Sequence, residues 1–243
     1  LQAYAGRGSI EGDPFIMMQP VTGIHDLAIW YPEQEADNIQ PYPPAIQMGD
    51  PSVWGNDYVT VDNIEFVNAY LGYKNNPNMG GCPIVRNIYG TPLKSGIRID
   101  SLADVGRIEN CDFSPLYWEN SGLPGAPSDK DSHRSYIYEN GIAYEMSRND
   151  WSYGRWLTAD RYGVGFYALN SFCEGAWNGE SRISNMYPNG ENYGMKFSNC
   201  HIGVAIEDTS NSGMVITHTE IDNCENGFVA RNTMASKISL IGW

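Results

Sequence analysis

The residue types best suited to chemistry gather in the segment SRNDWSYGRW. It brings the carboxylate of Asp150 and the guanidinium of Arg148 close in sequence to the rings of Trp151, Tyr153 and Trp156. Flat amphipathic rings are surfaces on which sugar rings pack, and this mixture of charge and rings is costly to bury. We expect the segment to line a groove, with Asp150 as a catalytic carboxylate. The alternative is an exposed loop.

A second cluster is the run Tyr117, Trp118 and Glu119. We expect the two rings to contact a ligand and Glu119 to act as a second acid. Here too, an exposed loop is the alternative.

Further carboxylates end short glycine-led segments with alternating apolar residues, namely Asp100 in GIRID, Glu145 in GIAYE and Glu207 in GVAIE. If these segments stack as parallel strands, neighbouring carboxylates lie about 4.8 Å apart. Hydrolysis of a glycoside uses two carboxyl groups, and a close pair raises the pKa of one of them, as a general acid requires. Asp100 and Glu145 are therefore candidate catalytic residues. A solvated acidic edge is the alternative.

No cofactor is expected, with Ca²⁺ as the alternative, because carboxylate clusters supply the oxygen ligands that it prefers. Two pairs are candidates, Asp100 with Asp104 and Asp129 with Asp131, and neither has the spacing of an EF-hand loop. The 5 cysteines are odd in number and contain no CxxC pair, which favours neither a disulfide framework nor a zinc site. We predict that Cys111, Cys200 and Cys224 are buried and unpaired.

The elements that position these residues are indicated by an internal repeat in which asparagine precedes isoleucine or cysteine. Three of the four spacings between these asparagines are 23 or 24 residues, the length of one coil of a parallel β-helix. Stacked coils would align the asparagines as a ladder of side-chain amides. The asparagines are Asn63, Asn87, Asn110, Asn199 and Asn223.

The glycine-led segments form a second frame, which predicts strands with one buried face, each preceded by a glycine that makes a tight bend. Their glycines are Gly96, Gly141, Gly163, Gly203 and Gly227. Helical periodicity is scarce, and residues 32–54 and 121–132 are expected to be long loops. We predict an all-β fold, a right-handed parallel β-helix (solenoid) with long loop insertions. It should span residues 1–243 as one domain, itself a possible fragment of a longer chain because SKISLIGW lacks a cap.

Composition limits the class of ligand. The net charge of -14 and the pI near 4.5 disfavour nucleic acid, anionic membranes and polyuronates, and favour a neutral ligand. No apolar run approaches the roughly 20 residues that span a bilayer. An N-terminus without methionine is consistent with a trimmed, exported chain, so we expect a secreted or extracellular protein.

The asparagine and glycine frames, with GIHDLAIWYPEQ, TPLKSGIRIDSLADVGRIENCDFSPLYW and SRNDWSYG, resemble the pectate lyase-like right-handed parallel β-helix superfamily, and most of all its bacterial glycoside hydrolase-type members. The resemblance covers nearly the whole chain and implies the fold. It leaves the reaction open, since the superfamily includes hydrolases, lyases, epimerases and tailspikes. The paired aspartates, GHG and RIK motifs of polygalacturonase-type members are absent, so no catalytic residue is carried over.

The sequence thus favours an extracellular carbohydrate-active protein, foremost a glycoside hydrolase that cleaves a neutral polysaccharide with two carboxylates. A non-catalytic polysaccharide-binding or tailspike-like protein is the first alternative, and a polysaccharide lyase or epimerase is the second. The expected partner is a polysaccharide or oligosaccharide, with no nucleic acid and no membrane, and a homo-oligomer is compatible with the solenoid.

Overall fold

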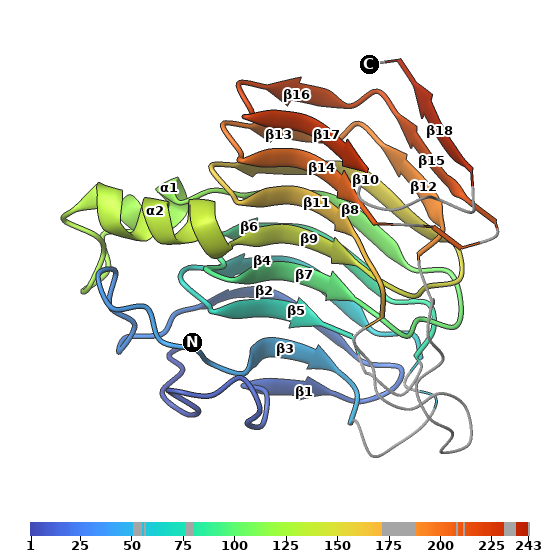
Figure 1. The fold of residues 1–243 in the computed structure, drawn as a ribbon. Coiled ribbons are helices and arrows are strands. Elements are labelled where there is room, and N and C mark those ends of the chain that lie inside the picture. The colour runs from blue at the N-terminus through green and yellow to red at the C-terminus, as the bar shows by residue number, and fades with distance from the viewer. Residues whose placement is uncertain are drawn as a thin grey trace.

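The computed structural model describes residues 1–50, 55, 57–75, 80–171, 188–207, 209–210, 212–230 and 237–242. Successive strands alternate between two all-parallel sheets, which confirms the predicted right-handed parallel β-helix (Figure 1). The first sheet contains, in spatial order, β1 (Ile16–Met18), β3 (Pro44–Met48), β5 (Leu71–Lys74), β7 (Ser95–Ile99), β9 (Ile142–Met146), β11 (Val164–Ala168), β14 (Ile202–Ile206) and β17 (Asn226–Ala230).

The second sheet lies opposite the first and contains longer strands in its first coils. Its path is β2 (Gly23–Ile29), β4 (Thr60–Phe66), β6 (Ile84–Gly90), β8 (Arg107–Phe113), β10 (Ser152–Asp160), β12 (Gly190–Tyr193), β15 (Met214–Thr217) and β18 (Ile238–Ile241). Beside this path, β13 (Lys196–Ser198) pairs with β10 and with β16 (Glu220–Asp222).

Each long strand of the second sheet is bent at one residue in the left-handed region. In β4 this residue is Asn63, with φ of 52°. The bend shifts the inward and outward alternation of side chains by one position. Val61, Ile64 and Phe66 are therefore all buried, while Glu65 stays partly exposed. Asparagine tolerates this conformation better than most residues, which explains why it recurs at the bend.

The predicted stacking of Asn63, Asn87 and Asn110 is confirmed. The residues on either side pair in register between β4, β6 and β8, and all three asparagines have φ between 52° and 55°. The Asn110 side-chain amide donates to Asn87 Oδ1 at 2.7 Å. Asn87 donates instead to Asp62 Oδ1, at 2.7 Å, so the ladder includes a carboxylate.

Asn199 and Asn223 belong to a different column, which corrects the single ladder. The register of β10 places Trp156 beside Asn110, whereas Asn199 lies beside Arg161, five residues further along. Asn223 then donates to Asn199 Oδ1 at 2.7 Å. Two separate turns need a left-handed residue, and both use asparagine.

We call the first of these two rows the bend column. Its members lie in register across the second sheet, and each has φ between 51° and 69°. They are Asp26, Asn63, Asn87, Asn110, Trp156, Gly194, His218 and Gly242.

The predicted bend role of the glycine frame is wrong for three of its five glycines, whereas Gly141 and Gly163 do lie directly before strands β9 and β11. Gly96, Gly203 and Gly227 lie inside strands, and none has a left-handed φ. A Cβ at Gly96 would overlap the Phe113 ring and a backbone carbonyl oxygen of the next strand, so glycine makes room there. Gly141 is two residues out of this register, since Ala143 lies beside Gly96.

Two segments predicted to be loops contain regular structure. Strand β3 lies within residues 32–54, and helix α2 (Lys130–Asn140) begins at the end of 121–132. Asp129 caps α2 by accepting from the Asp131 backbone amide at 3.0 Å. Helix α2 lies next to the short helix α1 (Leu116–Glu119) at one end of the strands (Figure 1).

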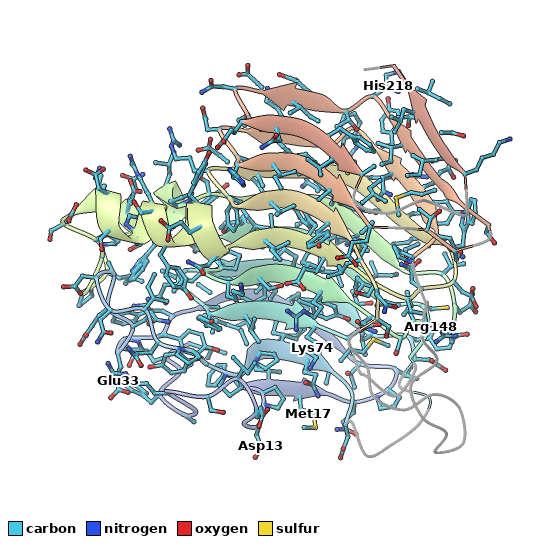
Figure 2. All side chains as sticks on the ribbon, in the orientation of Figure 1. Asp13, Met17, Glu33, Lys74, Arg148 and His218 are labelled. Carbon is cyan, nitrogen blue, oxygen red and sulfur yellow. The ribbon has the colours of Figure 1, made fainter. Side chains whose placement is uncertain are left out.

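The space between the sheets is filled by apolar and aromatic side chains (Figure 2). Tyr144, fully buried, donates its hydroxyl to the carbonyl oxygen of Cys111 at 2.7 Å. Cys111 and Cys200 are buried and free as predicted, while Cys224 is also free but only half-buried. Burial raises the pKa of the Cys111 thiol to about 12.

Candidate functional site

The segment SRNDWSYGRW does not converge on a single site. Asp150 is exposed in a turn, and Arg148 lies at the edge of the molecule near the ends of the first-sheet strands (Figure 2). Trp151 precedes β10 and is half-buried, with φ of 58°. Tyr153 and Trp156 lie in β10, where they line the surface groove described below.

Trp118 and Glu119 lie in helix α1 and are buried rather than exposed. Trp118 packs edge-on against His133 of α2, with 5.8 Å between ring centroids. The Glu119 carboxylate accepts two hydrogen bonds of 2.6 Å from the guanidinium of Arg134. Burial opposes ionisation of Glu119, but the Arg134 guanidinium outweighs it and lowers the carboxyl pKa. Within the described residues, Glu119 thus has the contacts of an anchor for α2.

Asp100 and Glu145 do not stack on each other. In the first sheet Glu145 is in register with Arg98 and binds its guanidinium at 2.9 and 3.1 Å. The Asp100 carboxylate accepts from the Ser171 hydroxyl at 2.7 Å and from the Ser101 backbone amide at 2.7 Å. The expected stack of free carboxylates in this frame is therefore not present. The strand pairing places Asp100 beside Ser147, two residues after Glu145.

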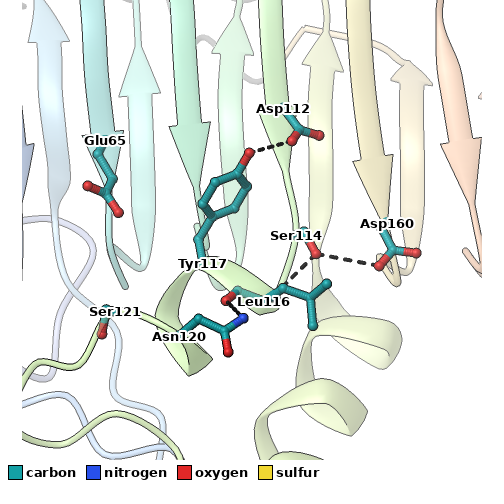
Figure 3. Close-up of a pocket in the computed structure, with 8 residues that line it drawn as sticks. All are labelled: Glu65, Asp112, Ser114, Leu116, Tyr117, Asn120, Ser121 and Asp160. Carbon is teal, nitrogen blue, oxygen red and sulfur yellow. Dashed lines mark hydrogen bonds between the residues drawn. The ribbon is translucent and has the colours of Figure 1, made fainter.

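Tyr117 lies in a pocket lined by three carboxylates, which we call the acidic pocket (Figure 3). The pocket has a volume of about 510 Å³ and lies on the outer side of the second sheet, against α1. Its lining residues are Glu65, Asp112, Ser114, Leu116, Tyr117, Asn120, Ser121 and Asp160.

The coil register positions the carboxylates of the acidic pocket. Glu65 of β4 pairs with Tyr89 of β6, which pairs with Asp112 of β8. Glu65 and Asp112 are thus two strand spacings apart, about 9.6 Å between Cα atoms. Asp160, at the end of β10, lies on the side of Asp112 away from Glu65 (Figure 3).

These carboxylates have different surroundings. Among the described residues no hydrogen bond or ion pair reaches Glu65, and partial burial raises its pKa above the usual value. Asp112 accepts hydrogen bonds from the hydroxyls of Tyr117, at 2.5 Å, and Thr158. The Asp160 carboxylate accepts hydrogen bonds from Asn199 Nδ2, at 2.6 Å, and from the guanidinium of the adjacent Arg161.

Tyr117 is held in its protonated form beside Asp112. Burial, reinforced by the hydrogen bond to that carboxylate, raises the pKa of the Tyr117 phenol. Its ring also lies 5.6 Å from that of Tyr89, measured between centroids, and the two rings are tilted by 45°. The position between Glu65 and Asp112 is thus occupied by aromatic surface and a hydroxyl donor.

A second concave surface, the aromatic groove, crosses strands β6, β8, β10, β12 and β15 of the same sheet. One part, of about 540 Å³, is lined by Arg86, Arg107, Glu109 and Ile84 together with Tyr153, Arg155 and Glu191. Those last three residues also line the other part, of about 390 Å³, with Trp156, Tyr193 and Thr217. The two parts are therefore continuous.

Sequence reasoning missed Glu65, Asp112 and Asp160. A signal for two of them was available, because Glu65 and Asp112 each stand two residues after a ladder asparagine, in NIEF and NCDF. In both strands the neighbours are buried, so an acidic residue at this position must face outward.

Comparison of the chain with protein-family models, with curated proteins and with solved structures finds no match. The class that the fold defines is thus the parallel β-helix, and the chemistry is argued from its surface. Over the described residues there is no group of three or more histidine, cysteine, aspartate or glutamate side chains that could hold a metal ion. In that same part of the chain, no helix is both long and apolar enough to cross a membrane.

Proposed function

We propose that this protein is a glycoside hydrolase that cleaves a neutral polysaccharide at the acidic pocket by an inverting mechanism. The observation that carries the proposal is the pair Glu65 and Asp112, two carboxylates on one face with opposite surroundings. One has no bonded partner in the described chain and a raised pKa, and the other accepts two hydroxyl hydrogen bonds. Pairs whose environments differ in this way can divide the roles of acid and base.

The spacing of the pair supports inversion over retention. Inverting enzymes hold their carboxyl groups about 6.5–9.5 Å apart to admit a water molecule, whereas retaining enzymes hold them about 5 Å apart. Two strand spacings, about 9.6 Å between Cα atoms, bring the carboxyl groups into the longer range after modest side-chain adjustment.

In the proposed reaction Glu65 donates its proton to the glycosidic oxygen as the bond from the anomeric carbon to that oxygen breaks. Asp112 takes a proton from a water molecule, whose oxygen bonds to the anomeric carbon from the opposite face. The products are two sugar chains, one with an inverted anomeric centre. Asp112 then releases its proton to solvent, and Glu65 takes one up from solvent, which restores the starting state. Tyr117 orients Asp112 through its hydroxyl. Asn120 and Ser121 at the rim supply polar groups for sugar hydroxyls.

The proposal is tested with Glu65→Gln and Asp112→Asn, which remove the ionisable group and keep the shape. Each variant should lower the release of reducing ends from a panel of neutral polysaccharides by about 100-fold or more. Glu220→Gln is the matched control. Glu220 lies in the same register as Asp112, three strand pairings along the sheet and outside the pocket lining, and it binds Lys196 at 2.7 Å. Its activity should be unchanged.

Proton NMR of the first product formed should show the inverted anomer. Wild-type activity in Glu65→Gln, or retention of configuration, would contradict the mechanism. Failure of the wild-type protein to release sugar from any polysaccharide in the panel would favour the non-catalytic alternative. Because a polysaccharide substrate lies outside the cell, we also propose that the protein acts as a secreted enzyme.

A further inference from the structure

Trp156 occupies a position in the bend column that asparagine or glycine would fill with less strain. Its φ is 55°, and its register neighbours are Asn110 on one side and Gly194 on the other. A bulky residue in the left-handed region is disfavoured, and such outliers cluster at functional sites. His218, with φ of 51°, is a second exception, two strands away from Trp156.

The strain at Trp156 is not compensated by burial of its ring. The side chain is 55% exposed, so it contributes little to the core. Gly194 leaves the space that the ring uses, because a Cβ there would come within 2.5 Å of the Trp156 ring.

The rings of three residues form a continuous row at this surface. Tyr193 lies edge-on to Trp156, with 5.1 Å between centroids, and its other neighbour is the His218 ring at 5.0 Å. His218 lies near the C-terminal end of the stack of coils (Figure 2). The row therefore runs along the stack, at right angles to the strands, as an elongated ligand would.

Polar groups of both signs flank the aromatic row. Arg155 and Glu191 line the same groove, and the Arg155 guanidinium lies 5.9 Å from the centre of the Tyr153 ring. Along the whole groove three arginines accompany two glutamates, and one of these arginines, Arg86, is bound to Asp62. This lining has little net charge for capturing a polyanion, and the whole chain carries -14. Sugar hydroxyls, in contrast, both donate and accept hydrogen bonds, and sugar rings pack on exposed aromatic faces.

We propose that the aromatic groove is a second carbohydrate-binding site, which holds a neutral glycan on Trp156 and Tyr193 apart from the acidic pocket. This inference goes beyond the hydrolytic function, since binding here requires neither Glu65 nor Asp112. The chemical class of the ligand is an uncharged polysaccharide, with Arg155 and Glu191 bonding to its hydroxyls.

The decisive variant is Trp156→Asn, which restores the residue type of the neighbouring coils. Migration is measured in native gels containing hydroxyethylcellulose, β-1,3-glucan, galactomannan or xylan. At least one of these should retard the wild-type protein, and Trp156→Asn should weaken that retardation at least tenfold in apparent Kd. Its Tm should equal or exceed that of the wild type, because asparagine relieves the backbone strain. Tyr4→Asn is the matched control, since Tyr4 is 54% exposed and lies outside the groove; its retardation should be unchanged.

Retardation of Trp156→Asn equal to the wild type, or no retardation of the wild type by any of the four polysaccharides, would overturn the inference. If Trp156→Asn does not fold, Tyr193→Ala replaces it, because that change leaves the bend column intact, and it must weaken retardation. Glu65→Gln separates the two proposals. It should abolish hydrolysis and keep full retardation. Hydrolysis retained in this variant would contradict the hydrolase proposal, whereas loss of retardation would contradict the second binding site.

Discussion

At the scale of single residues, the conformation of the backbone decides which side chains the bends accept. Asn110 combines a left-handed φ of 53° with an amide that donates to Asn87 in the next coil. The residue type thus serves both the turn and the contact between coils, which explains its recurrence in the repeat.

Replacement of Asn110 by alanine should lower the free energy of unfolding by about 2 kcal/mol, because alanine resists the left-handed region and leaves the ladder bond unmade. Asn110→Gly should cost less, about 1 kcal/mol, since glycine adopts that φ freely and only the hydrogen bond is lost. Urea denaturation measures both. A larger loss for glycine than for alanine would contradict the role of the backbone.

Glu65 sets the expected pH dependence of catalysis. As the proposed general acid it must be protonated, and burial raises its pKa, so kcat/KM should fall as pH rises through a value above that of an ordinary glutamic acid. The pH profile of kcat/KM and ¹³C NMR titration of the Glu65 carboxyl carbon measure this. Titration of Glu65 at or below the ordinary value would exclude it as the acid.

At the scale of elements, the docking of α2 on the coil stack supports the acidic pocket. Helix α1 supplies Tyr117 to the pocket and Glu119 to the interface with α2, where Arg134 and His133 meet the carboxylate. Burial lowers the pKa of His133. Burial would raise the pKa of Glu119, but its hydrogen bonds and ion pair with Arg134 outweigh burial and lower it.

Glu119→Gln should destabilise the protein by about 3 kcal/mol, because it leaves the Arg134 guanidinium without its buried partner. Lys130→Gln is the control; Lys130 is half-exposed and 3.8 Å from Glu119, and the change should cost under about 0.5 kcal/mol. Urea denaturation at pH 7 gives both values. Similar losses in the two variants would show that the buried pair does not anchor α2.

The sign of the pH effect on this interface follows from the two lowered pKa values. A lowered histidine pKa means that stability is lost as pH falls below the ordinary value of about 6.5, when the unfolded chain takes up the proton. The pKa of Glu119 in the folded protein is below the ordinary value of about 4.3. Further stability is therefore lost as pH falls from that ordinary value through the pKa in the folded protein. Both effects weaken the α2 interface in acid. Replacement of His133 by glutamine should therefore flatten the fall in stability between pH 7 and pH 5 in urea denaturation.

At the scale of the whole molecule, the coils stack closely because one register of the first sheet carries small residues. Gly72, Gly96, Ala143, Gly165 and Gly203 follow one another in this register. Aromatic side chains of the second sheet fill the space that a larger residue would need, as Phe113 does at Gly96.

Gly96→Ala should therefore destabilise the protein by about 2–3 kcal/mol through overpacking against Phe113 and the neighbouring backbone. Gly227, in the same register, is the control, because a Cβ there would meet only Ile221 at the ordinary contact distance of 3.8 Å. Gly227→Ala should be nearly neutral. Thermal denaturation compares the two, and equal losses would contradict the packing role of the column.

Sequence alone was sufficient to predict the solenoid, the ladder of Asn63, Asn87 and Asn110, and the free thiols of Cys111 and Cys200. The physical reason is that stacked coils of equal length must present equivalent residues at equal spacing. The length and pattern of the repeat therefore predict the architecture. The function and localisation inferred from the sequence stay proposals.

Only the tertiary structure decided which turn each asparagine occupies, what the glycines do and which carboxylates meet. Between Asn110 and Asn199 the chain passes through α2 and the long strand β10, and the number of residues in such excursions does not reveal the register at which the next coil resumes. Glu65 and Asp112 are 47 positions apart and face one pocket because two strand pairings align them through Tyr89. Glu119, beside Tyr117 in sequence, is instead buried against Arg134, since α2 folds back over it. Such pairings depend on contacts between segments that are distant in sequence, and the spacing of nearby residues does not predict them.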